Sequence, residues 1–253
     1  MDLGIKGKVA IVTGGTKGIG RAIVETFANE GANVAFCARN AQEVAETEQA
    51  LRAKGVQAKG TVLDVADAAA LRAWVADTAS TFGGIDMAVA NVSALAIPDE
   101  DANWETSFHV DLMGTVNLCK AVIPHLEHSD VKSLVAISSV SGREADFASG
   151  PYGTFKTAII GYMAGLALQL ADKGIRANTV SPGNTYFPGG VWENIEQGNP
   201  DLFGFAMGLN PTGRMGTPQE IASGVVFISS PLSSRTSGAN LLIDGALTRG
   251  IQF

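Results

Sequence analysis

The 253-residue sequence lacks the features that mark several large classes of protein. Its two cysteines, Cys37 and Cys119, lie in separate apolar runs, which argues against a disulfide framework and favours a reducing compartment. No apolar run approaches the length that a membrane-spanning helix needs. The first eight residues show neither the apolar core nor the cleavage site of a secretory signal. We therefore expect a soluble, cytoplasmic protein.

Clusters of basic or metal-binding side chains are also scarce. The formal net charge is −7 and the lysines and arginines are scattered, so we do not expect nucleic acid as the main partner. His125 and His128 are three residues apart, but no carboxylate or third histidine joins them convincingly. We interpret both as surface residues and expect no metal site.

Apolar runs typical of buried strands alternate with helical patterns along the chain. The first such run is Val9 to Val12 and the last is Asn240 to Ile243. Strands that are apolar without a break belong to parallel sheets covered by helices on both faces. The length suits one α/β domain or two small ones, and no repeat or low-complexity tract interrupts the pattern. The sequence predicts one doubly wound α/β domain over residues 1–253.

A glycine-rich turn follows the first strand. Residues 13–20 read Thr-Gly-Gly-Thr-Lys-Gly-Ile-Gly and lead directly into a helical pattern. Glycines let the backbone approach a phosphate closely, and a helix N-terminus presents free N–H groups and a positive dipole. These residues therefore favour a nucleotide site, and a purely structural turn is the alternative.

Three polar residues follow the apolar run Leu134–Ile137. Ser139 comes just after it, and Tyr152 and Lys156 are four residues apart, which puts them on one face of a helix. A neighbouring ammonium favours the phenolate, so such a tyrosine can exchange protons near neutral pH. Amphipathic residues on a helix surface are the alternative interpretation of the Tyr–Lys pair.

The glycine turn, Ser139 and Tyr152-x-x-x-Lys156, in this order, resemble the short-chain dehydrogenase/reductase family along essentially the whole chain. The resemblance implies a Rossmann-type fold and hydride transfer between a nicotinamide cofactor and a small carbonyl/alcohol substrate. Ser139 would hold the carbonyl oxygen, Tyr152 would protonate it, and Lys156 would assist the tyrosine and hold the nicotinamide ribose. A cofactor-binding sensor or scaffold without turnover is the alternative.

The resemblance also implies a choice of cofactor. Lys17 and Arg39 stand where relatives bind a 2′-phosphate, which favours NADP(H) over NAD(H); two solvated surface charges are the alternative. Asp64 would bond the adenine or cap the next helix, a role for which Asp67 competes. The full set of implied cofactor contacts is Gly14, Thr16, Lys17, Gly18, Ile19, Gly20, Arg39, Asp64, Val65, Asn91, Tyr152, Lys156, Pro182, Gly183 and Thr185.

Three positions depart from the family pattern. Ser93 replaces a glycine after the fourth strand, and Phe187 replaces a threonine in the nicotinamide loop. Asp111 replaces a catalytic asparagine in a helix that we predict over 104–126. We expect Asp111 to sit in the proton relay behind Lys156, and an ordinary solvated helix residue is the alternative.

Two further segments carry expectations drawn from the family. Residues 184–210 are rich in glycine, proline and aromatic side chains, and they correspond to a mobile substrate lid. The helix that begins near Tyr152 is apolar nearly all round, whereas a surface helix has a polar face. Because relatives pair through this helix and the long one before it, we expect a homotetramer or homodimer.

Overall fold

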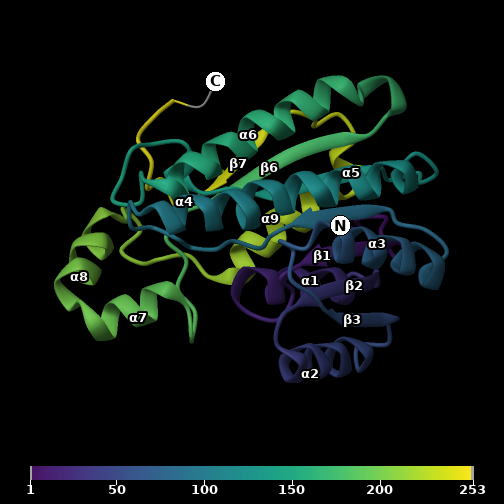
Figure 1. The fold of residues 1–253 in the computed structure, drawn as a ribbon, viewed down its shortest axis with the longest axis horizontal. Coiled ribbons are helices and arrows are strands. Elements are labelled where there is room, and N and C mark those ends of the chain that lie inside the picture. Colours follow the sequence, from purple (N-terminus) through teal and green to yellow (C-terminus); the bar gives the residue numbers. More distant parts are fainter. Residues whose placement is uncertain (1, 252–253) are drawn as a thin grey trace.

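A single parallel sheet organises the chain, for which a computed structural model describes residues 2–251. Its seven strands lie in the order β3-β2-β1-β4-β5-β6-β7. Figure 1 shows β1, β2 and β3 at one side of the molecule and β6 and β7 at the other. The predicted domain span also includes Met1, Gln252 and Phe253, which lie outside the described residues. The strands are β1 (Val9–Thr13), β2 (Asn33–Ala38), β3 (Ala58–Val62), β4 (Met87–Ala90), β5 (Ser133–Ile137), β6 (Arg176–Pro182) and β7 (Asn240–Ile243).

Helices pack on both faces of this sheet, as predicted. Alternate residues of β1 serve different cores, since Ala10 and Val12 join one cluster and Ile11 joins the other. The helices are α1 (Gly18–Asn29), α2 (Ala41–Arg52), α3 (Ala68–Phe82), α4 (Asp101–Ser107), α5 (Gly114–Leu126), α6 (Pro151–Gln169), α7 (Val191–Gly198), α8 (Pro200–Leu209) and α9 (Pro218–Ser229). The first cluster contains side chains of α1, α2 and α9, and the second contains side chains of α3, α5 and α6.

Local capping explains several helix boundaries. Asp67 caps α3 by accepting from the N–H groups of Ala69 and Ala70, both at 2.9 Å, so Asp67 and not Asp64 holds that role. The capping box predicted at Thr217 and Glu220 is formed at the start of α9. Helix α6 begins at Pro151, one residue earlier than predicted, because proline suits the first position of a helix.

The helix predicted over 104–126 is the element that differs most. It starts three residues earlier, as α4, and reaches α5 through a π-helical segment, Phe108–Met113. A π segment adds one residue to a turn without breaking the helix. The apolar pattern of the sequence therefore continues across it, and the π segment could not be predicted from that pattern. None of the helices in residues 2–251 combines the length and apolar character required to cross a membrane.

Candidate active site

A cavity of about 670 Å³ lies at the carboxyl ends of the central strands. Chain connections run outward from β1 in one direction and from β4 in the other, so these two neighbours mark the switch point where open α/β sheets bind ligands. The glycine turn, Ser139, Tyr152 and Lys156 all line this cavity, although they are far apart in the sequence.

Backbone contacts shape the glycine turn between β1 and α1. The N–H groups of Gly14 and Gly15 donate to the carbonyl of Cys37 at 2.8 and 3.2 Å. Gly20 has no room for a side chain, since a Cβ there would lie 1.9 Å from the Gly14 carbonyl oxygen. Within residues 2–251 no side chain caps the N-terminus of α1, so its first N–H groups are available to an anion.

Asn91 supports this turn from the end of β4. Its side-chain amide donates to the carbonyl oxygens of Thr13 and Gly14, both at 3.1 Å. The residue lines the cavity, as the resemblance implied, but its side-chain nitrogen is committed to the protein backbone. Asn91 therefore acts in the structure as a brace for the glycine turn.

Charged side chains line the end of the cavity near β2 and α2. Lys17 forms an ion pair with Glu43, with 2.8 Å between Nζ and Oε1. The hydroxyl of Thr16 donates to the other oxygen of this carboxylate at 3.2 Å. Hydrogen bonding from Lys17 lowers the pKa of Glu43 below its usual value, and Thr16 adds to that effect. Arg39 lines the same region.

Glu43 is a site residue that the sequence reasoning missed. It lies in the first turn of α2, four residues after Arg39. Glutamate is common in the first turn of a helix, where it interacts with the helix dipole, so the sequence alone gives it no other role. Only the fold brings it against the glycine turn. Asp64 and Val65 also line the cavity; the Asp64 carboxylate accepts from the N–H of Ala66 at 2.9 Å.

Ser139 and Tyr152 come from adjoining elements at the other end of the cavity. Ser139 follows β5 and its hydroxyl oxygen accepts from the N–H of Ser141 at 3.2 Å. Tyr152 and Lys156 stand one turn apart in α6, and Nζ of Lys156 lies 5.6 Å from the centre of the Tyr152 ring. The Ser138 hydroxyl donates to the Lys156 carbonyl at 2.8 Å, which ties α6 to the end of β5.

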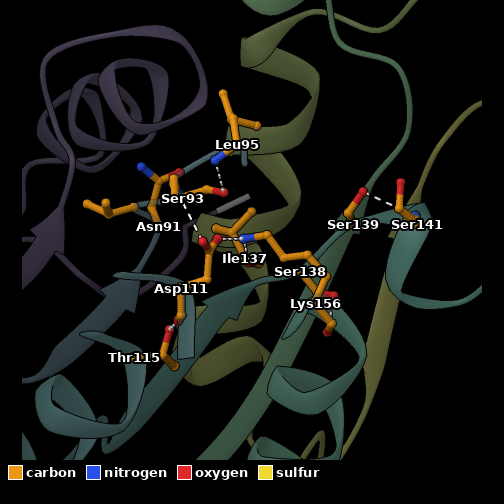
Figure 2. Close-up of polar contacts among 12 residues, drawn as sticks. Asn91, Ser93, Leu95, Asp111, Thr115, Ile137, Ser138, Ser139, Ser141 and Lys156 are labelled. Carbon is orange, nitrogen blue, oxygen red and sulfur yellow. Dashed lines mark hydrogen bonds and ion pairs between the residues drawn. The ribbon is translucent and has the colours of Figure 1, made fainter. Parts of the chain in front are cut away.

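Asp111 forms a buried ion pair with Lys156, as Figure 2 shows. Nζ lies 3.3 Å from Oδ1 of Asp111, and the two side chains are 2% and 1% exposed. The contact is an ion pair and not a hydrogen bond, since Oδ1 of Asp111 has no hydrogen-bond partner among the described residues. The Lys156 ammonium also donates to the Ile137 carbonyl at 3.1 Å. The other carboxylate oxygen accepts from the N–H of Ala94 at 3.1 Å. The solvated alternative for Asp111 is therefore excluded.

The segment after β6 closes over the glycine turn. Phe187 lies against Gly18, where a Cβ would be 2.4 Å from the ring. Gly183 is equally confined, since a Cβ there would lie 2.8 Å from Asp244. Pro182, Gly183 and Thr185 line the cavity, and the Thr185 hydroxyl donates to the Gly183 carbonyl at 2.9 Å.

Apolar side chains form the wall next to Ser139 and Tyr152. Phe147 and Trp192 meet edge to face, with 5.9 Å between ring centres. Leu95 and Ile97 face the same cavity, and Leu95 has a φ of 51°, which is rare for a branched side chain. Only the first part of the 184–210 segment lines the cavity. Its last lining residue is Ile195, and among the described residues none of α8 lines the cavity.

The fold and the glycine turn at its switch point define a dinucleotide-binding protein of the Rossmann type. Residues 14–248 match the family model described as enoyl-(acyl carrier protein) reductase. The chain belongs to the short-chain dehydrogenase/reductase family and is an oxidoreductase of that family.

Three proteins illustrate the similarity. Isoepoxydon dehydrogenase of Penicillium expansum is 41% identical, over 100% of this chain and 99% of its own length. L-sorbose reductase of Gluconobacter frateurii, solved with NADPH and L-sorbose, is 28% identical with a TM-score of 0.89, covering 99% of this chain and 100% of that one. NAD⁺-bound xylitol dehydrogenase is 29% identical with a TM-score of 0.88, covering 96% and 100%.

Proposed function

We propose that this protein transfers hydride between NADP(H) and a small carbonyl/alcohol substrate, with Ser139, Tyr152 and Lys156 as its catalytic residues. The observation that carries the proposal is their meeting in one cavity with the glycine turn. The residues present fit a dinucleotide, because Gly18 and Gly20 leave no bulk in the turn and α1 has no side-chain cap. The cofactor supplies or takes the hydride, and the protein supplies position and a proton.

The proton steps follow from the contacts in the site. Because the Ser139 oxygen accepts from Ser141, its own hydrogen is left to donate to a carbonyl oxygen of the substrate. Tyr152 gives its phenolic proton to the same oxygen during reduction and removes it during oxidation. The ammonium of Lys156 supports the phenolate form, and Asp111 acts as a positioning residue that holds this ammonium in place.

Preference for NADP(H) is the finer part of the proposal. Relatives of known structure include one with NADPH and one with NAD⁺, so the family does not decide the choice. Arg39 follows β2, where an acidic residue would favour NAD(H), and within residues 2–251 no ion pair engages its guanidinium. A guanidinium suits the bidentate recognition of a phosphate.

The relatives' names support an uncharged, oxygen-rich substrate. These names refer to isoepoxydon, L-sorbose and xylitol. Among the described residues, the cations that line the cavity are Lys17, Arg39 and Lys156, which are already assigned to the cofactor and to the catalytic pair. An anionic substrate would lack a charged partner there. We also propose that segment 184–210 acts as the lid over this substrate.

Assembly through α6 belongs to the same proposal. Gly161 and Gly165 have open space where a side chain would lie, and Leu168 is 83% exposed. Such a face fits pairing with a second copy, as a homodimer or homotetramer. The two buried, free thiols fit a cytoplasmic location.

An assay with a panel of neutral ketones and alcohols tests the proposal. We expect steady oxidation of NADPH with at least one ketone, and a higher kcat/KM for NADPH than for NADH. Equal values, or a preference for NADH, would remove the assignment of the phosphate site. Tight cofactor binding without turnover on the whole panel would instead support the sensor or scaffold.

A further inference from the structure

Glu43 binds Lys17, one of the two cations to which we assign a 2′-phosphate. One carboxylate oxygen pairs with Lys17 at 2.8 Å and the other accepts from the Thr16 hydroxyl at 3.2 Å. Asn40, the N-cap of α2, accepts from the Glu43 N–H at 3.1 Å and so fixes the first turn of the helix. The carboxylate therefore bridges the glycine turn to α2.

Lys17, Arg39 and Glu43 line the same end of the cavity. Lys17 and Arg39 bring positive charge to this end of the cavity and Asp64 brings negative charge, so the Glu43 carboxylate lowers by one unit the positive charge that a ligand meets there. Because its pKa is lowered by Lys17 and Thr16, Glu43 is ionised at neutral pH. A phosphate dianion that reaches for Lys17 must compete with this carboxylate, whereas an uncharged ribose hydroxyl can donate to it.

We propose that Glu43 is a specificity-determining residue that limits the preference for 2′-phosphorylated over unphosphorylated dinucleotides. The inference rests on the proposed cofactor site and goes beyond it, because it assigns an opposing role to a residue between the two cations. Discrimination in favour of the phosphate comes mainly from Arg39. Lys17 contributes little while its ammonium is paired with the Glu43 carboxylate, although its side chain is 67% exposed.

The test is equilibrium binding of NADPH and NADH, followed by the fluorescence of the nicotinamide ring. In Glu43→Gln we expect the Kd for NADPH to fall about threefold to tenfold, the scale of one unit charge near a protein surface. The Kd for NADH is expected to stay the same or to rise. Lys17→Met should weaken NADPH binding only slightly in the wild type and several-fold in the Glu43→Gln background.

Glu46→Gln is the matched control, since it removes the same charge from the same helix outside the cavity. The Glu46 carboxylate is exposed and accepts from the Gln42 amide at 2.9 Å. A similar gain in this control would overturn the inference, because the effect would then be long-range. So would equal gains for both nucleotides, or weaker NADPH binding in Glu43→Gln, which would make Glu43 a support for Lys17.

Failure of the proposed function has a different signature. A wild type that binds neither nucleotide overturns both proposals. Binding of both nucleotides with an unchanged affinity ratio in Glu43→Gln overturns the role of Glu43 alone. NADH binding also reports whether each variant keeps an intact site.

Discussion

The ion pairs Lys17–Glu43 and Lys156–Asp111 each join an ammonium to a carboxylate. The first pair lines one end of the cavity, whereas in the second pair Lys156 lines the other end and Asp111 lies behind it. The side chains of the first pair are 67% and 26% exposed, and those of the second are 2% and 1% exposed. Water screens the first pair, so separating its charges costs little. The second pair has lost its hydration, so removing one partner leaves a buried charge without compensation.

This difference separates two tasks of the site. The exposed end can change its charges by substitution with little effect on the fold, which suits a region that selects between cofactors. The buried end joins α6, the end of β5 and the loop after β4 through Lys156, Ile137 and Ala94. Stability and chemistry are therefore coupled at that end.

Breaking the buried pair is expected to give the largest effect. Lys156→Met should lower the free energy of unfolding by about 3 kcal/mol, because the Asp111 carboxylate stays buried and unpaired. Lys17→Met should change it by less than about 0.5 kcal/mol. Urea denaturation followed by circular dichroism measures both.

The double variant Lys156→Met/Asp111→Asn serves as the control. It removes both charges and keeps an oxygen that accepts from Ala94. Recovery of most of the lost stability is expected. Similar losses in Lys156→Met and Lys17→Met would show that burial does not distinguish the pairs.

Removing the proton donor beside the buried pair tests its chemistry. Tyr152→Phe should lower kcat at least about a hundredfold, the usual scale of general acid–base catalysis. The variant should still bind NADPH. Tyr162→Phe in the same helix is the matched control, because Tyr162 packs against the core and does not line the cavity. Near-normal turnover in Tyr152→Phe would remove Tyr152 from the mechanism.

Reversing a charge at the exposed end should alter cofactor choice and leave stability alone. Arg39→Asp is expected to lower the preference for NADPH over NADH at least about tenfold, since one lost charge-assisted bond weakens binding by that scale. Ratios of kcat/KM for the two cofactors measure it. Arg72→Asp, an exposed change outside the cavity, should leave the ratio intact.

Neutralising Asp111 sharpens the comparison at the buried end. The carboxylate holds the Lys156 ammonium in place and accepts from the N–H of Ala94. Asp111→Asn should keep substantial activity, because the amide oxygen can still accept from Ala94. Loss of turnover in a variant that still folds and binds NADPH would contradict a positioning role, and Asp101→Asn, at an exposed position of α4, is the control.

A third, exposed ion pair at the start of α9 should give the smallest effect. Arg214 donates to Glu220 at 2.9 Å and lowers its pKa to about 2. A lowered pKa means that the stabilisation is present above the usual range of a glutamate and is lost as pH falls from about 4 towards 2. Glu220→Gln should cost less than about 1 kcal/mol at neutral pH, and its thermal midpoint should approach that of the wild type in acid. A constant difference at all pH values would contradict the ionic origin.

The sequence predicted the fold because strand patterns and the glycine turn are local. The sequence alone shows the apolar runs of β1 and β5. It also shows the order of Ser139, Tyr152 and Lys156. It does not show the glycine turn's contact with Glu43, since 26 residues separate Lys17 from that side chain (43 − 17 = 26). The ring of Phe187 over Gly18 is hidden for the same reason.

Asp111 was predictable from the sequence only in part. Its place in the helix was predictable, and so was a location behind Lys156. Its direct ion pair with the ammonium depends on how deeply the helix packs, because the same carboxylate on a shallower face would be hydrated. The burial of Asp111 depends on how the helices pack on the sheet, and the residue type alone does not predict it.

The π-helical segment Phe108–Met113 joins α4 to α5 and rotates the side chains of α4 about the helix axis relative to those of α5. Each residue of an α-helix advances about 100° around the axis, so the extra residue turns everything before it relative to everything after it. In α4, Trp104 packs on Phe155 of α6, while α5 sends Leu118 and Val122 into the sheet core. The extra residue thus changes the direction in which α4 side chains point relative to those of α5. Trp104 can then contact α6 while Leu118 and Val122 pack in the sheet core.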